Sequence, residues 1–448
     1  MAAPEDLRQM KVAMICDDMT WENWSRECCA TALTPNNWKR VLCAQRPDVF
    51  FCESAWLGRK DLGGCWRGAV YRNHKILFDN RKELLRILDF CKQNGIPTVF
   101  WNKEDPTFFD DPRHDFKDTA LKFDWIFTTA AECVPRYRAL GHPHVDVMMF
   151  SFSPYLFSPM GSVPKERKAI FAGSWIGEDA DRCRATEGLF AMAGDAGIPL
   201  TIFDRQTQTA RRCFPEKYRP CIRGCVPYAS LGQEIRRAEY ALNINTVTNS
   251  DTMFARRVFE LAASNTVILS NASKGMQKLF PPGAICYLGQ PFSEENRENQ
   301  KRRNLDFVFA QHTNRIRFTQ LFCKMGILRE PEPVEICVLD PKNLLQGRII
   351  AGKRFIAVPV RTLAGQENER FAYGILPSKG RLQMLDCVLP HLCYLPEDCG
   401  IRIVGKPLYE IAEDNEHEDV LYPWNLFSAV CRESGKAAKK YLLGDWEV

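Results

Sequence analysis

Short apolar runs alternate with amphipathic segments along the first third of the chain. Residues 80–94 carry apolar side chains at helical spacing, and Gly95 follows as a helix stop. Continuous short apolar runs are typical of parallel strands that are buried on both faces. They cover residues 11–16, 48–53, 97–102, 125–129 and 145–149. The alternation predicts a parallel α/β domain over residues 1–150.

Proline and glycine then interrupt any regular element over residues 151–168, which we interpret as a linker. After this break the strand and helix pattern restarts over residues 169–330. Strands are expected at 169–173, 199–204, 222–226, 240–245, 266–270 and 284–288. Helices are expected at 182–196, 229–239 and 253–263. Two successive α/β units imply two Rossmann-like domains with a cleft between them.

The remaining chain follows a different pattern. Residues 296–324 are strongly charged and predict one long helix that packs across both domains, with a solvated helix as the alternative. From residue 331 to 448 the alternation is lost, although short strands are expected at 355–360 and 401–404. We expect a small C-terminal α+β appendage there, with no role that the sequence identifies.

Charge and composition narrow the class of protein. The net charge of +5 comes from 60 basic and 55 acidic residues spread along the chain, which argues against a nucleic-acid or membrane face and suggests a mild preference for anionic ligands. The polar start and the lack of a long apolar run predict a cytoplasmic protein without a membrane span. Its 19 cysteines are then expected to be reduced and mostly buried. Seven histidines and no Cys-x-x-Cys spacing predict no metal site.

Ligands of open parallel sheets bind beyond the carboxyl ends of the strands, so the polar loops that follow strands are the candidate sites. In the second domain, Gly173 and Ser174 follow a strand and allow close approach of backbone to a diphosphate, while Arg205 is suited to phosphate charge. An ordinary strand-to-helix turn and a solvated arginine are the structural alternatives. In the first domain the candidates are Asp17, Asp18, Glu53, Glu104 and Asp105, each of which is by itself more readily structural than catalytic.

Residues 242–271 (LNINTVTNSDTMFARRVFELAASNTVILSN) hold the densest group of polar side chains. A buried strand ends in this group, a polar loop that caps the next helix follows, and the helix itself is charged. The candidates are Asn243, Asn245, Ser250, Thr252, Arg256, Arg257 and Glu260. Helical spacing places Glu260 beside both arginines, so a salt-bridged surface face is the structural alternative to a binding site.

Residues 254–271 (FARRVFELAASNTVILSN) closely resemble the donor-binding helix and following strand of GT-B glycosyltransferases in the CgeB-like, spore maturation protein-like, group. The form typical of that group is RxFExxASGTxxxS. Further segments are similar to the group in the same order: residues 15–27 (ICDDMTWENWSRE), 52–58 (CESAWLG), 100–106 (FWNKEDP), 124–129 (DWIFTT), 170–175 (IFAGSW) and 242–246 (LNINT). The resemblance covers about residues 11–325.

The resemblance implies a GT-B fold, with two Rossmann-like domains facing a central cleft, and a hexosyltransferase-like activity on a nucleoside-diphosphate sugar. By this resemblance Glu260 binds the ribose hydroxyls, Asn243 and Asn245 line the donor side, and Arg256 or Arg257 faces the diphosphate. Related helices carry a sugar-binding acid eight residues before the glutamate, where this chain has Thr252. This departure places both the sugar contact and a retaining stereochemistry in question.

The acceptor is expected to bind at the first domain, where Asp17, Asp18, Glu53, Glu104 and Asp105 are available to position or deprotonate its hydroxyl. No convincing Asp-x-Asp follows a strand, so we expect neither a catalytic metal nor a cofactor beyond the nucleotide-sugar co-substrate. Two alternatives remain open. One is a nucleotide-sugar epimerase, and the other is a degenerate, non-catalytic GT-B binding module, which Thr252 favours.

Overall fold

The computed structural model describes residues 6–159, 164–205, 213–295 and 297–330, together with eight strands between residues 334 and 443. The chain forms two compact units. The first comprises Met1–Phe157, Arg167–Asn304 and Gln311–Glu330 and contains two parallel sheets. The second comprises Ser158–Glu166, Leu305–Ala310 and Pro331–Val448 and contains one mixed sheet.

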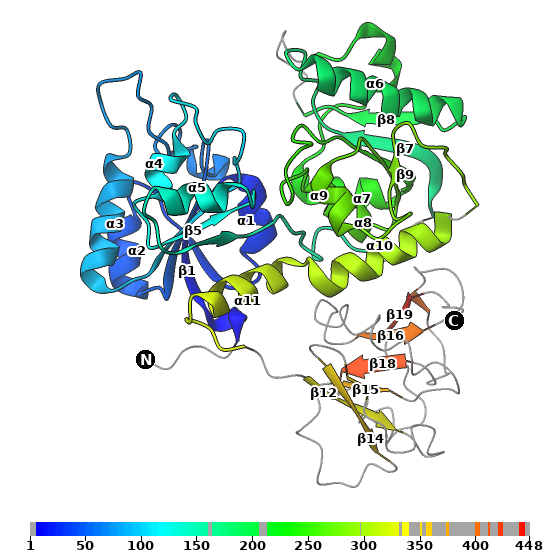
Figure 1. Ribbon diagram of the computed structural model, residues 1–448. Coiled ribbons are helices and arrows are strands. Elements are labelled where there is room, and N and C mark those ends of the chain that lie inside the picture. Colours follow the sequence, from blue (N-terminus) through cyan, green and yellow to red (C-terminus); the bar gives the residue numbers. More distant parts are fainter. Residues whose placement is uncertain are drawn as a thin grey trace. The chain divides into compact units, whose positions relative to one another are not determined.

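The first sheet is six-stranded and parallel throughout, in the order β2-β1-β3-β4-β5-β6 (Figure 1). Its strands are β1 (Lys11–Ile15), β2 (Cys29–Ala32), β3 (Val49–Glu53), β4 (Thr98–Asn102), β5 (Trp125–Thr128) and β6 (Val145–Val147). Every residue of β3 and β4 is buried. Strands covered on both faces need no polar alternation, which is why continuous apolar runs form the centre of this sheet.

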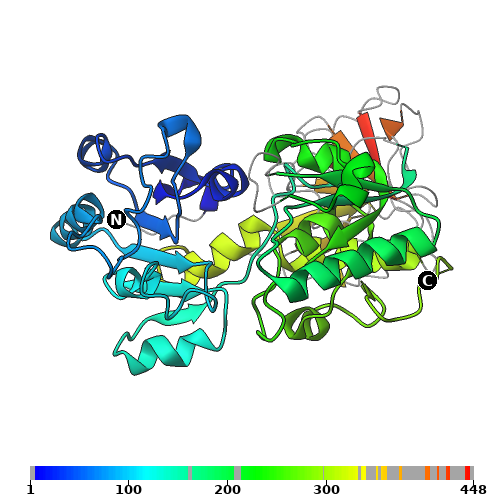
Figure 2. The ribbon, with the colours of Figure 1, turned by 90° about the horizontal axis from the view of Figure 1, so that it is seen from above.

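Helices cover both faces of this sheet (Figure 2). They are α1 (Asp18–Trp24), α2 (Trp38–Gln45), α3 (Lys82–Asn94), α4 (Phe116–Ala120), α5 (Cys133–Ala139) and, from the far end of the unit, α11 (Asn314–Lys324). Successive residues of β3 point to opposite faces, so that Phe50 packs with α2 and α3 while Phe51 packs with α1 and α11. The chain therefore returns to the first sheet after completing the second.

The second sheet is five-stranded and parallel, in the order β11-β10-β9-β7-β8 (Figure 1). Its strands are β7 (Glu166–Ala172), β8 (Leu200–Phe203), β9 (Ala238–Asn243), β10 (Val267–Ser270) and β11 (Cys286–Tyr287). The helices that follow its strands are α6 (Ala180–Asp195), α7 (Tyr228–Arg236), α8 (Arg257–Ala263), α9 (Lys274–Leu279) and α10 (Arg297–Gln311). Two successive Rossmann-like sheets confirm the predicted α/β fold class.

Several predicted elements are wrong in detail. Residues 222–226 form no strand, and only Ile222 makes an isolated bridge, to Ile202. The predicted helix over residues 296–324 is two helices, α10 and α11. The interruption has a clear cause, because Thr313 caps α11 by accepting a hydrogen bond from the Ile316 amide. The backbone of His312 and Asn314 is bonded to Phe152 instead of continuing the helix.

Helix α8 is shorter than the expected 253–263, because Arg256 is its N-cap residue. The chain leaves α8 through Asn265, whose φ of 55° lies in the left-handed region. The donor-binding helices that residues 254–271 resemble carry glycine at this position. Asparagine is one of the few other residues that adopt this conformation readily, so the substitution preserves the turn into β10.

The second unit contains an eight-stranded mixed sheet in the order β13-β14-β12-β15-β18-β16-β19-β17. Its strands are β12 (Val334–Leu339), β13 (Ile350–Ala351), β14 (Phe355–Val360), β15 (Tyr373–Ile375), β16 (Cys399–Ile403), β17 (Ile411–Ala412), β18 (Val420–Pro423) and β19 (Lys439–Leu443). Both strands expected here from the sequence are present as β14 and β16. The helical part of the predicted appendage falls on residues outside those described.

Candidate functional site

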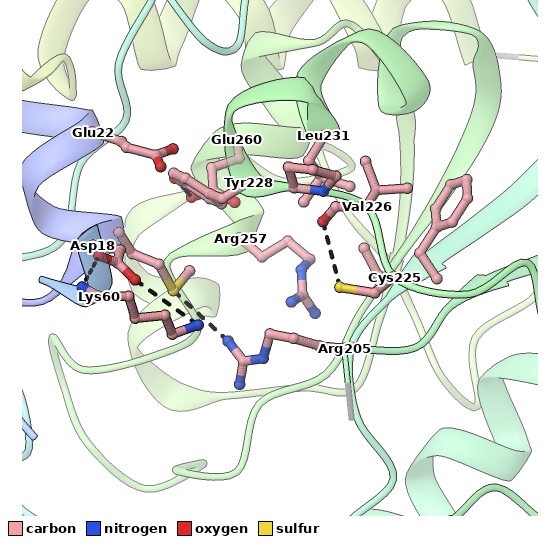
Figure 3. Close-up of a pocket in the computed structure, with 15 residues that line it drawn as sticks. Asp18, Glu22, Lys60, Arg205, Cys225, Val226, Tyr228, Leu231, Arg257 and Glu260 are labelled. Carbon is pink, nitrogen blue, oxygen red and sulfur yellow. Dashed lines mark hydrogen bonds and ion pairs between the residues drawn. The ribbon is translucent and has the colours of Figure 1, made fainter. Parts of the chain in front are cut away.

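A cavity of about 530 Å³ lies in the first unit and is lined from both parallel sheets (Figure 3). The loops after β7 and β8, helix α1, the segment leading into α7 and helix α8 contribute its walls. The lining residues are Asp18, Met19, Glu22, Lys60, Ala172, Gly173, Phe203, Arg205, Cys225, Val226, Pro227, Tyr228, Leu231, Arg257 and Glu260. Most of them follow the carboxyl ends of strands, where open parallel sheets bind ligands.

Positive charge gathers on one part of the cavity wall. Figure 3 shows the guanidinium groups of Arg205 and Arg257 and the ammonium of Lys60 in the lower half of the view. Burial lowers the pKa of Arg257 to about 10; Glu260 opposes this, whereas the charges of Arg205, Arg182 and Arg256 add to it. Its Nε is buried and has no hydrogen-bond partner among the described residues. A bound anion would reduce the repulsion among these positively charged side chains.

Gly173, at the end of β7, leaves space for the Arg257 side chain because it has no Cβ. A Cβ at this position would lie 2.9 Å from Phe171 Cζ and 3.3 Å from Arg257 Nη1. Ser174, the next residue, is not among the lining residues. Its carbonyl oxygen accepts a hydrogen bond of 3.2 Å from Arg182 Nη1, which holds a further arginine close to this strand end.

Glu260 is a buried carboxylate of the cavity wall, with 2% of its surface exposed. Its Oε1 accepts hydrogen bonds from the Tyr228 hydroxyl at 2.6 Å and from Arg256 Nε at 2.8 Å. The alternative of a surface ion pair with both arginines is therefore wrong, because the carboxylate is buried and its ion pair is with Arg256. Among the described residues no hydrogen bond reaches Oε2, which leaves that oxygen for a ligand.

Of the five acidic candidates in the first domain, Asp18 lines the cavity. Its Oδ1 accepts a hydrogen bond of 2.8 Å from the Lys60 amide. Asp17 is instead saturated by the loop after β3, since its carboxylate accepts hydrogen bonds of 2.7–2.9 Å from the backbone amides of residues 56–58. Asp17 therefore fixes this loop and has little capacity left for a substrate proton.

Glu53 and Lys103 form a buried pair behind Asp17. Lys103 Nζ lies 3.2 Å from Glu53 Oε1 and 3.4 Å from Asp17 Oδ2. Burial raises the pKa of the Glu53 carboxyl, and Lys103 opposes the shift. Burial opposes the protonated form of Lys103, but the charges of Glu53 and Asp17 outweigh it and raise its pKa. Glu53 and Lys103 form an ion pair with each other, and neither residue lines the cavity.

Glu104 and Asp105 are also absent from the cavity wall. Burial raises the pKa of Glu104, while Lys103 and a hydrogen bond from Trp56 lower it. Asp105 accepts hydrogen bonds from Asn102, Thr128 and Tyr137 at 2.7–3.1 Å. Burial raises its pKa to about 7 despite these bonds. We assign Asp105 a structural position within the first domain.

The polar residues predicted between β9 and α8 mainly hold loops in place. Asn243 donates to Ser270 Oγ at 2.9 Å, and Asn245 Oδ1 accepts from the Ala255 amide at 2.9 Å. Ser250 donates to Glu132 Oε2 at 3.0 Å. Thr252 donates to the Thr129 carbonyl at 2.7 Å and accepts from the Ala131 amide at 2.8 Å. None of these four predicted donor residues lines the cavity.

Sequence reasoning missed Glu22, Lys60 and Tyr228. Glu22 lies one helical turn after Asp18, so the i, i+4 spacing was a usable signal. Tyr228 begins α7 directly after Pro227, and because residues 222–226 form no strand, strand-end reasoning could not place it in the site. Lys60 reaches the wall through its bond with Asp18, 42 residues away, and no local pattern predicts that contact.

Three expectations about the whole chain meet the structure only in part. No cysteine among the described residues is paired in a disulfide. Of these described cysteines Cys16, Cys28, Cys52, Cys91 and Cys133 are buried, so that most of the described thiols are at least partly exposed, contrary to the expectation. In the described parts of the chain, no three His, Cys, Asp or Glu side chains are grouped to hold a metal ion. The same parts contain no helix that is both long and apolar enough to cross a membrane.

Residues 190–322 match a protein-family model described as "Glycosyl transferase-like". The matched segment contains Arg205, Arg257 and Glu260 but covers less than half of the chain. No curated protein sequence matches the chain.

Among solved structures, an alpha-glucosyltransferase in complex with UDP and a 13-mer DNA is similar at 8% identity and a TM-score of 0.45, over 71% of this chain and 100% of that chain. The sucrose-phosphate synthase of Thermosynechococcus elongatus is similar at 11% identity and a TM-score of 0.39, over 65% of this chain and 77% of that chain. The Anabaena protein HepE in complex with UDP is similar at 12% identity and a TM-score of 0.35, over 71% of this chain and 97% of that chain. Similarity at this level assigns neither fold nor function, which rest on the residues of this chain.

Proposed function

We propose that this chain is a GT-B glycosyltransferase, which transfers a hexose from a nucleoside-diphosphate sugar to a hydroxyl of an acceptor. One observation carries this proposal: a cavity at the carboxyl ends of parallel strands combines clustered arginines with a buried carboxylate. Its volume of about 530 Å³ lies in the range of small-molecule sites. The local resemblance of residues 254–271 to donor-binding helices and the family-model match over residues 190–322 support it.

The arginines suit the diphosphate of the donor. Arg257 and Arg205 line the cavity, and Arg182 lies close enough for its charge to lower the pKa of Arg257. A guanidinium presents several N–H donors in one plane and binds phosphate oxygens in pairs. Because Gly173 has no side chain, the backbone at the end of β7 can also approach the diphosphate closely.

Glu260 suits the ribose. Its Oε1 is held by Tyr228 and Arg256, so Oε2 has a fixed position from which it accepts hydrogen bonds from ribose hydroxyls. Such bonds to a charged acceptor are each worth about 1.5–3 kcal/mol. The diphosphate and ribose together orient the donor, so that the sugar extends toward the residues contributed by the first domain.

We further propose that transfer needs no metal. The departing nucleoside diphosphate carries negative charge, which positioned arginines stabilise in the way that a metal ion does in other transferases. Arg205, Arg257 and Lys60 all line the cavity and supply that charge from the protein itself.

Calorimetric titration with a panel of nucleoside diphosphates tests the binding part of this proposal. The titration should show that one nucleoside diphosphate binds far more tightly than the corresponding nucleoside. At 100 times its dissociation constant this diphosphate should also raise the free energy of unfolding by about 2.7 kcal/mol, which thermal denaturation measures. Incubation of nucleotide sugars without an acceptor then separates the competing activities. Rearranged nucleotide sugar would indicate an epimerase, and failure to bind any nucleotide would indicate a non-catalytic module.

A further inference from the structure

Helix α1 presents two carboxylates to the cavity, Asp18 and Glu22, one helical turn apart. They differ in their surroundings. Asp18 Oδ1 accepts the Lys60 amide at 2.8 Å, and Asp18 Oδ2 lies 3.9 Å from Lys60 Nζ. Asp18 is thus tied to the loop that follows β3, whereas Glu22 carries no such bond among the residues the structure describes.

The Oε2 of Glu22 is buried and has no hydrogen-bond partner in the described parts of the chain. Two arginines close to it are engaged elsewhere. Arg59 bonds Asp61 and stacks over the Trp21 ring at 4.0 Å, and Arg26 lies over the Tyr155 ring at 5.7 Å. A carboxylate that lines a cavity and makes no hydrogen bond to the described residues remains available to a ligand.

Figure 3 shows the Glu22 carboxylate directed from α1 toward the part of the cavity where Tyr228 and Glu260 lie. In the proposed binding mode the nucleotide occupies Glu260 and the arginines, and Glu22 faces this donor from the α1 wall of the same cavity. Burial raises the pKa of Glu22, and the charge of Asp18 adds to the shift, while Arg26 and Arg59 oppose it. A raised pKa makes a carboxylate a stronger base near neutral pH.

We propose that Glu22 is the general base that deprotonates the acceptor hydroxyl, an assignment that rests on the proposed sugar transfer. The acceptor proton passes to the Glu22 carboxylate as the acceptor oxygen forms a bond to the anomeric carbon. The bond from that carbon to the phosphate oxygen breaks, and the nucleoside diphosphate leaves with the electron pair. A single displacement of this kind inverts the configuration of the anomeric carbon.

The other acidic residues near this wall are less suited to the role. Asp17 is saturated by three backbone amides, Glu53 is paired with Lys103, and Asp18 is bonded to Lys60. Glu260 already accepts two hydrogen bonds and belongs to the nucleotide end of the cavity. Unlike these four residues, Glu22 makes no hydrogen bond or ion pair with the described residues.

Water serves as the acceptor in the test, with the nucleotide sugar that the wild-type chain hydrolyses fastest as the donor. Glu22→Gln should lower kcat for hydrolysis about 100-fold or more, leave the dissociation constant of the nucleoside diphosphate unchanged, and abolish the acid limb of the pH–rate profile. Glu178→Gln, an exposed glutamate before α6, is the matched control and should behave as the wild type.

NMR of the first-formed free sugar supplies an arm that needs no variant, because inversion converts an α-linked donor to a β-sugar. A retained configuration, or Glu22→Gln with an undiminished kcat, would overturn the assignment while leaving sugar transfer intact. If Glu22→Gln binds no nucleoside diphosphate, Glu22→Asp replaces it and should keep a weakened activity with its acid limb. A wild-type chain that binds nucleoside diphosphates but rearranges nucleotide sugars without releasing free sugar overturns both proposals.

Discussion

The Tyr228 hydroxyl donates a hydrogen bond of 2.6 Å to Glu260 Oε1, joining the first residue of α7 to the middle of α8. The same hydroxyl accepts a hydrogen bond of 2.7 Å from Asn23 Nδ2 of α1. Glu260 is therefore held by a chain of contacts that begins in the first domain. This arrangement fixes one carboxylate oxygen and leaves the other for the ligand, which makes the charge of Glu260 testable separately from its shape.

Glu260→Gln keeps the shape of the side chain and removes its charge. We expect the affinity for the preferred nucleoside diphosphate to fall about ten- to hundred-fold, because the lost charge weakens hydrogen bonds worth roughly 1.5–3 kcal/mol. The melting temperature should also fall, since Arg256 loses its buried counter-charge. Calorimetric titration measures the first effect, and an affinity within twofold of wild type would remove Glu260 from the nucleotide site.

Arg257→Met should weaken diphosphate binding without lowering the melting temperature, whereas Glu260→Gln lowers both. Arg205, Arg182 and Arg256 all place positive charge near Arg257, so its removal relieves repulsion and should not lower the melting temperature of the free chain. The affinity for the diphosphate should nevertheless drop at least about tenfold, through lost charge-assisted hydrogen bonds. Arg40→Met, at an exposed position of α2, is the control. Unchanged diphosphate affinity in Arg257→Met would contradict the role of this arginine.

The central strands of both sheets were predictable because full burial requires continuous apolar runs, as in β3 and β4. Edge strand β2 was not, since Cys29–Ala32 is partly exposed and has no apolar run. The division between α10 and α11 was hidden for another reason. It depends on backbone bonds between Phe152 and residues 312–314, and such long-range pairing leaves no periodic signal in the sequence.

The same limit applies to the cavity. Strand-end reasoning and resemblance named Asp18, Gly173, Arg205, Arg257 and Glu260, all of which line it. The other acidic candidates follow the correct strands, but their oxygens are taken up by contacts distant in sequence, such as the 40 residues between Asp17 and the Leu57 amide. Chain position predicts which loops reach a site, whereas bonding partners decide which side chains remain available there.

Chelation tests the source of the charge that stabilises the leaving group. Because Arg205, Arg257 and Lys60 supply that charge from the cavity wall, turnover and donor affinity should be unchanged in EDTA. The measurement is the rate of nucleoside-diphosphate release with and without EDTA, followed by addition of Mg²⁺ or Mn²⁺. An activity lost in EDTA and restored by either ion would show that the arginines do not suffice.

Glu27 predicts how stability depends on pH. It is fully buried, and burial raises its pKa to about 7 although Arg315 Nε lies 3.5 Å from its Oε2 and opposes the shift. A folded-state pKa above the unfolded value near 4.5 favours the protonated folded chain. The contribution of protonated Glu27 to the free energy of unfolding is therefore fully present below pH 4.5, and it is lost as the pH rises to about 7.

Glu27→Gln should consequently be more stable than wild type at pH 8, by up to about 3 kcal/mol, and close to wild type at pH 5. Urea denaturation at both pH values gives the comparison. Asp105, whose pKa is also raised to about 7, contributes a slope of the same sign to both proteins, so the difference between them isolates Glu27. Equal stability at pH 8 would mean that Arg315 compensates the buried charge in full.

Thr252 stands where related donor-binding helices carry a sugar-binding acid, yet its hydroxyl joins the two domains through Thr129 and Ala131. Thr252→Val keeps the volume and removes both hydrogen bonds, which should cost about 1–3 kcal/mol of stability because a backbone carbonyl and an amide lose their partner. Affinities for the nucleoside diphosphate and for the nucleotide sugar should both stay at wild-type values. Thr248→Val, at an exposed position of the same loop, is the control for stability. A Thr252→Val chain that binds the nucleoside diphosphate normally but the nucleotide sugar weakly would instead place Thr252 against the sugar.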